Sequence, residues 1–127
     1  MVFSNGNTCT DAYELKEKSH AQVPHKKEIH PFDMPHGLYG VFISKDAVIG
    51  ENCVIFHQVT IGSNSIEGSK HYGAPKIGNN VYIGAGAKII GGITIGDNVN
   101  IGANCIVFSD IPSNSTVVMN APRIIQK

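Results

Sequence analysis

Histidine is the residue type in this sequence that is best suited to proton transfer near neutral pH. Among six histidines, His36 stands in the segment MPHGLYG, and two carboxylates, Glu28 and Asp33, precede it closely. A base that takes a proton from a hydroxyl group works best when a neighbouring group fixes the tautomer of its ring. His36 could act as such a base if a carboxylate oriented it, and the residues alone leave this role and that of an ordinary loop histidine equally open.

The spacing of the other histidines does not indicate a metal site. His20, His25 and His30 follow one another every five residues, which fits no common ligand spacing on one helix face or strand. His57 falls at a predicted turn, and His71 lies in a polar, glycine-rich segment. We interpret these histidines as residues that hold no metal, and we expect no bound metal.

Charge and composition argue against several classes of protein. The chain has 127 residues with 10 Lys plus Arg and 10 Asp plus Glu, so its formal net charge is zero. This balance argues against a nucleic acid partner or an anionic lipid surface, and no apolar run approaches the ~20 residues that span a membrane. Residues 1–10 show no signal peptide. Cys9, Cys53 and Cys105 are spaced too irregularly for a disulfide framework. We expect one domain in a reducing, cytoplasmic setting.

An aliphatic residue recurs at every sixth position over much of the chain. Helices need apolar spacings of three and four, which a period of six does not supply. The next residue is usually glycine, and the residue four positions on is small or β-branched, as at Ala47, Cys53 and Ala87. The aliphatic positions are Ile43, Ile49, Ile55, Ile61, Ile77, Ile83, Ile89, Ile95, Ile101 and Val107.

Strand alternation explains this period. The small residue and the next aliphatic residue are two positions apart, so both can face inward with one outward residue between them. The third position after each aliphatic is mostly Asn, Gly or Asp, which tolerate the left-handed backbone region. Each hexapeptide is therefore predicted to be a short strand and a turn. The turn positions are Asp46, Asn52, Gln58, Asn64, Asn80, Gly86, Gly92, Asn98, Asn104 and Asp110.

Such short strands are stable only when they stack on others about 4.8 Å apart. Three hexapeptides per turn would make a triangular coil, so the predicted fold is an all-β parallel solenoid over residues 41–112. A protruding loop at 67–76 interrupts it, because this segment is polar and rich in glycine. Residues 1–40 are expected to form a short helix at 11–20 and an extended segment, and residues 113–127 to cap the last coil.

The hexapeptides IGENCV, IGNNVY, IGAGAK, IGDNVN and IGANCI resemble those of the hexapeptide-repeat acyltransferases. This resemblance implies a left-handed parallel β-helix, a handedness that the spacing alone does not show. Together with EIHP, the His-Gly segment and QVTIGS, the pattern is similar to serine O-acetyltransferases over roughly residues 28–125. One departure is Ala74 before Pro75, where the family usually has a second histidine.

The resemblance implies an acetyl-CoA-dependent O-acetyltransferase that acts on a hydroxyl of serine or of a sugar. It places the catalytic base at His36. As the orienting carboxylate we prefer Glu28, which matches a family position that is usually Asp, to Asp33, which is nearer in sequence. Ala85 and Ala103, eighteen residues apart, should stack at one corner and leave the backbone open to the pantetheine arm. The residues expected to bind the cofactor are Gly62, Lys76, Ala85, Gly86, Lys88, Ala103 and Arg123, and those expected to bind the acceptor are His30 and His57.

Apolar outward residues suggest self-association. The family is usually trimeric, so we expect a homotrimer in which His36 and the coenzyme groove come from adjacent chains. Two alternatives stay open: an amino-sugar N-acetyltransferase, and a non-catalytic or metal-binding β-helix protein. The repeat from Ile77 onward contains no histidine, which argues against the metal-binding alternative.

Overall fold

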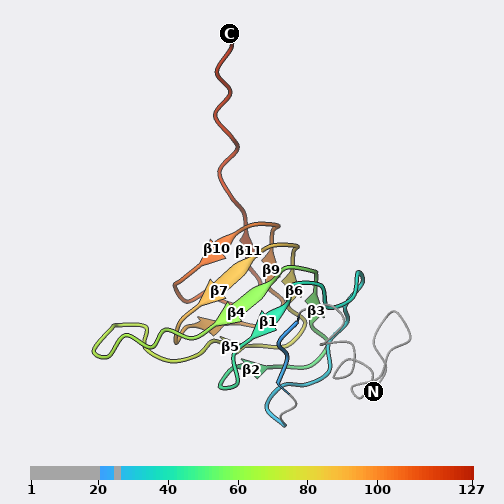
Figure 1. The fold of residues 1–127 in the computed structure, drawn as a ribbon, viewed down its shortest axis with the longest axis vertical. Helices are drawn as coiled ribbons and strands as arrows, with labels where there is room; N and C mark the ends of the chain where they lie inside the picture. The colour runs from blue at the N-terminus through green and yellow to red at the C-terminus, as the bar shows by residue number, and fades with distance from the viewer. Residues whose placement is uncertain (1–20, 25–26) are drawn as a thin grey trace.

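The computed structural model describes residues 21–24 and 27–127, so the helix expected at 11–20 lies outside the described residues. Eleven strands of two or three residues wind into a coil with three parallel sheets (Figure 1). The first sheet contains β1 (Phe42–Ile43), β4 (Thr60–Gly62), β7 (Lys88–Ile90) and β10 (Ile106–Val107). The second contains β3 (Val54–Ile55), β6 (Tyr82–Ile83), β9 (Asn100–Ile101) and β11 (Thr116–Val117). The third contains β2 (Val48–Ile49), β5 (Lys76–Ile77) and β8 (Thr94–Ile95).

The core is a stack of aliphatic side chains inside the coil, as the six-residue period predicted. All ten aliphatic positions are buried, each at most 3% exposed. The register keeps each of them over its equivalent: Ile43 pairs with Ile61, and Ile61 with Ile89. Small inward residues such as Ala47 and Ala87 fill the remaining space at 0% exposure.

The predicted left-handed turns occur at two of the three corners. Asn52, Asn80 and Asn98 have φ of 55–57° where the chain passes from the third sheet to the second. Gln58, Gly86 and Asn104 have φ of 58°, 74° and 59° where it passes from the second sheet to the first.

The prediction is wrong at the third corner, from the first sheet to the third, where none of Asp46, Asn64, Gly92 and Asp110 has positive φ. Asn64 and Asp110 instead use Oδ1 to accept the backbone N–H of Ile66 at 2.9 Å and of Thr94 at 2.8 Å. Gly91, one position earlier than expected, takes the left-handed conformation there. Asn and Asp thus serve this corner as hydrogen-bond acceptors.

The segment before the repeat forms an irregular first coil. Gln22, Ile29 and Asp33 make parallel bridges to Phe42, Ile49 and Val54, one on each sheet. This coil covers the lower end of the core with buried apolar side chains, which are Ala21, Ile29, Phe32, Met34 and Leu38. The extended segment expected from the prolines is therefore part of the solenoid.

A loop and a tail leave the coil. The predicted pendant loop protrudes between β4 and β5, and an antiparallel bridge between Asn64 and Gly73 closes its base (Figure 1). After β11 the chain runs away from the coil as an exposed tail at 118–127. The described part of the chain contains no helix long and apolar enough to cross a membrane.

Replacing Ile89 by alanine should lower the free energy of unfolding by about 2–5 kcal/mol, because Ile89 is fully buried and the loss leaves a cavity. Ile66→Ala is the control, because Ile66 is 71% exposed and its loss should change stability by less than about 0.5 kcal/mol. Urea unfolding followed by circular dichroism measures both. Equal losses would contradict the inward assignment of the repeat.

Cys53 gives a second test of the core. Burial raises the pKa of its thiol, and the Asp97 carboxylate acts in the same direction, while a backbone hydrogen bond at Val81 opposes them. The folded pKa is therefore higher than the unfolded one. Its stabilising contribution is complete below the unfolded pKa and is lost as the pH rises through the folded pKa.

We expect the free energy of unfolding to decrease as the pH rises above roughly 8.5, where the unfolded thiol ionises. Cys53→Ala should remove part of this decrease. Urea unfolding of both proteins at neutral and alkaline pH measures it. An identical decrease in the variant would show that Cys53 does not contribute.

Candidate active site

His36 lies on a tight turn just below the corner from the second sheet to the first. The turn is closed by the N–H of Gly37, which donates to the carbonyl of Met34 at 3.0 Å, and Gly37 has φ of 77°. The His36 side chain is exposed, yet its ring contacts two others. Its centroid is 5.6 Å from that of Phe56 and 5.5 Å from that of His57, the latter in an edge-to-face arrangement at 87°.

Phe56 extends this group of rings onto the second sheet. It is half-buried, and its ring centroid is 5.1 Å from that of Tyr82, an outward residue of β6. His36 therefore lies between His57 and Phe56, and the row of rings continues from Phe56 to Tyr82. The row limits where the imidazole of His36 can turn, because ring packing restricts its rotation.

Equivalent corner residues stack in a column through successive coils, from Tyr39 through His57 to the two alanines. We call Tyr39, His57, Ala85 and Ala103 the site corner. Backbone hydrogen bonds connect its levels: Gln58 N–H donates to Tyr39 O at 2.7 Å, Gly86 N–H to His57 O at 3.0 Å, and Asn104 N–H to Ala85 O at 2.9 Å. The expected stacking of Ala85 and Ala103 is observed. His57 and the two alanines thus share one corner of one chain.

Gly84 and Gly86, which flank Ala85 in the site corner, leave little room for a side chain. A Cβ on Gly86 would overlap the side-chain Oδ1 of Asn104, and one on Gly84 would lie 2.6 Å from the backbone N of Ala103. Gly86 also needs its positive φ for the turn. The corner above His57 is therefore a smooth strip of backbone and methyl groups.

Lys88 is attached to the same corner. Its Nζ donates to the carbonyl of Gln58 at 2.8 Å, although the two residues are thirty positions apart. Gln58, Phe56 and this hydrogen bond were not among the expected site features. The left-handed position of Gln58 was the only sequence signal that could have pointed to them.

Other expected site residues lie elsewhere on the coil. Glu28 and His30 flank Ile29, which bridges to β2 of the third sheet, and Lys76 belongs to β5 of that sheet. Gly62 is buried at the end of β4 on the first sheet, and its nearest side-chain neighbour is Ile90. Arg123 lies on the exposed tail (Figure 1).

Of the two carboxylates, Asp33 shares the second sheet with Phe56, through its bridge to Val54. No hydrogen bond joins His36 to Glu28 or Asp33 within residues 21–24 and 27–127.

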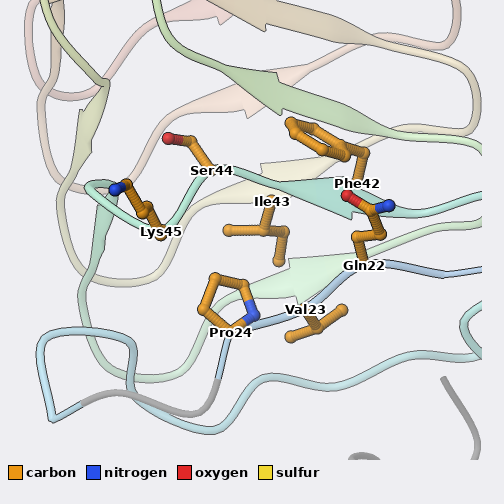
Figure 2. A pocket seen from close by; sticks show the side chains of 7 residues that line it. All are labelled: Gln22, Val23, Pro24, Phe42, Ile43, Ser44 and Lys45. Carbon is orange, nitrogen blue, oxygen red and sulfur yellow. The ribbon is translucent and has the colours of Figure 1, made fainter.

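Three surface pockets formed by described residues lie away from the site corner. Figure 2 shows a pocket of about 440 Å³ at the lower end of the coil, between the segment Gln22–Pro24 and the strand β1 with Ser44 and Lys45. Another, of about 610 Å³, is formed by the pendant loop around Tyr72. A third, of about 240 Å³, includes Lys76 and Asp97. None of these is lined by His36 or His57.

Metal ligands do not gather in the described residues, where no three His, Cys, Asp or Glu side chains are placed to hold an ion. Cys53 and Cys105 are buried and free. The Cys53 thiol donates to the carbonyl of Gly78 at 3.3 Å and serves the core. The chemistry available at the site corner is therefore that of an imidazole beside a smooth backbone strip.

Comparisons with known proteins agree with this fold. The family model "Bacterial transferase hexapeptide (six repeats)" matches residues 74–109. A serine acetyltransferase of Synechococcus elongatus is 41% identical over 107 residues, which cover 79% of this chain and 43% of that protein. One from Helicobacter pylori is 42% identical over 108 residues, covering 79% of this chain and 61% of that protein. The chain thus spans about half the length of these relatives.

Solved structures of serine acetyltransferases are also similar to this chain. Serine acetyltransferase isoform 3 of Entamoeba histolytica, in complex with cysteine, superposes with a TM-score of 0.64 at 44% identity, covering 76% of this chain and 33% of that one. The Neisseria gonorrhoeae enzyme in complex with serine gives 0.63 at 39% identity, covering 79% and 37%. Residues 74–109 therefore match the bacterial hexapeptide transferases, and the chain shares the left-handed parallel β-helix of the serine acetyltransferases, to which it is similar.

Proposed function

We propose that this protein is an acetyl-CoA-dependent O-acetyltransferase, similar to serine acetyltransferase, that acts on a hydroxyl of serine or of a sugar. One observation carries the proposal: the His36 ring packs on His57, and His57 begins the column that continues through Ala85 and Ala103. A candidate base and a strip open to an extended thioester therefore adjoin on one corner.

His36 acts as the general base in this proposal. The acceptor hydroxyl loses its proton to the imidazole while its oxygen attacks the thioester carbonyl. The tetrahedral intermediate then collapses, the C–S bond breaks, and the imidazolium returns the proton to the departing thiolate. Asp33 or Glu28 would orient the ring, and the position of Asp33 on the second sheet favours Asp33.

The pantetheine arm of acetyl-CoA would run along the site corner over Ala85, Gly86 and Ala103. Small side chains there let an extended ligand approach backbone groups closely. Lys76 and Arg123 are the cations proposed to meet its phosphates, and Gly62 is proposed as a further contact on the first sheet. The Nζ of Lys88 already binds the carbonyl of Gln58. Arg123 would need an assembly to approach the corner, because the tail leaves its own coil (Figure 1). His57 and His30 are proposed to contact the acceptor.

We also propose a homotrimer in a cytoplasmic setting. The first sheet exposes Phe42 and Ile106, which are 39% and 67% accessible, and Phe108 follows β10 at 66%. Apolar residues gathered on one face favour association with further copies. That His36 and the coenzyme groove come from adjacent chains of this trimer stays a prediction.

His36→Ala should reduce thiol release from acetyl-CoA by roughly 10²–10⁴-fold, the usual contribution of a general base. Release is measured with a chromogenic thiol reagent and a panel of serine, homoserine and sugars. His71→Ala is the matched control, since His71 lies in the pendant loop, and it should keep the original rate.

The panel also separates the alternatives. Free amines need less help from a base, so activity on amino sugars with little dependence on His36 would favour N-acetylation. Absence of thiol release with every acceptor would support a non-catalytic protein.

Ile106→Glu should dissociate the trimer, because it places a charge in the proposed apolar contact. Ile66→Glu serves as control, since Ile66 is similarly exposed, at 71% against 67%, but lies in the loop. Light scattering after size exclusion gives the mass of each. A trimeric Ile106→Glu protein would exclude the first sheet from the interface.

A further inference from the structure

We propose that His57 is a positioning residue for His36, and that Lys88 holds the corner from which His57 reaches it. The inference rests on the proposed acetyltransferase function and names what orients the base. In this inference Lys88 holds the backbone of the site corner, whereas the family resemblance led us to expect Lys88 at a phosphate of the cofactor.

The contact between the two imidazoles is the first observation. The His36 ring packs on the His57 ring, at 5.5 Å between centroids and 87° between planes. The Nδ1 atom of His57 is buried there without a hydrogen-bond partner. Buried polar atoms left without partners are rare and costly, and they call for a structural or catalytic explanation.

The backbone next to His57 is the second observation. Gln58 has φ of 58°, and every other described residue with positive φ is glycine or asparagine. Glutamine gains no compensating local hydrogen bond in this region, so the turn is strained. Such a conformation persists only when its surroundings hold it in place.

Lys88 helps to keep Gln58 in this conformation. Gln58 is fixed on both sides, because its N–H donates to Tyr39 O at 2.7 Å and its carbonyl accepts from Lys88 Nζ at 2.8 Å. The next level, Gly86 N–H, binds the carbonyl of His57 itself at 3.0 Å. These bonds fix the direction in which the His57 side chain leaves the corner, and thus the ring against which His36 packs.

The test measures kcat and KM for acetyl-CoA and for serine in Lys88→Met, Lys88→Arg and His57→Gln. Lys88→Met and His57→Gln should lower kcat about five- to tenfold and leave KM for acetyl-CoA within twofold. Lys88→Arg should keep most of kcat, because it preserves a donor. Lys70→Met, an exposed loop lysine, is the matched control and should behave as wild type.

Double variants test the inference further. Asparagine occupies the equivalent left-handed positions at φ of 55–60° elsewhere in the coil, so Gln58→Asn should restore much of kcat in the Lys88→Met background. In a His36→Ala background, His57→Gln should cause no further loss. Thermal melting of each variant shows that it is folded.

Three results would overturn the inference. They are a higher KM for acetyl-CoA with unchanged kcat in Lys88→Met, full activity in His57→Gln, or an undiminished effect of His57→Gln without His36. Full activity of His36→Ala itself would instead overturn the proposed function, so the two failures are distinguishable.

Discussion

Every coil must return to the same register on the coil below, and the rest of the structure depends on this constraint. A strand of two residues has too few hydrogen bonds to be stable alone, and it gains stability only from parallel pairing above and below. Residues eighteen apart, such as Phe42 and Thr60, pair directly. Thr60 pairs with Lys88, twenty-eight positions on, because the pendant loop adds ten residues without moving the strands that follow. The last coil closes two residues short, with Asn100 paired to Thr116.

The same constraint builds the site. Because coils stack in register, whatever occupies the corner before a strand of the first sheet lies above its equivalent in the coil below. The alanines at 85 and 103 are therefore aligned with His57. The pendant loop leaves at a different corner, between the first and third sheets, so it interrupts neither this column nor its hydrogen bonds. A solenoid can thus carry a long insertion without interrupting a column of stacked corner residues.

The turn chemistry differs from corner to corner for local reasons. Asparagine or glycine takes positive φ where the backbone itself must reverse, as at Asn52 and Gly86. Asp110 and Asn64 lie at equivalent places on the remaining corner, but their side chains accept hydrogen bonds from backbone N–H groups. Gln58 is the exception at the site corner, where a residue poorly suited to positive φ is held by contacts from Tyr39 and Lys88. Departure from the repeat therefore coincides with the candidate active site.

The amino-acid sequence by itself determined the all-β solenoid, its inward residues, the pendant loop and the stacking of Ala85 over Ala103. These features depend on a period of six, and periodicity is a local property that can be counted along the chain. It also singled out His36, through a resemblance in the surrounding residues. Only the tertiary structure decided that residues 21–24 and 27–34 belong to a first coil, because their bridges follow no regular period. Only it placed His57 against His36 and Lys88 on the carbonyl of Gln58, since these contacts join residues twenty-one and thirty positions apart through the winding of the coil.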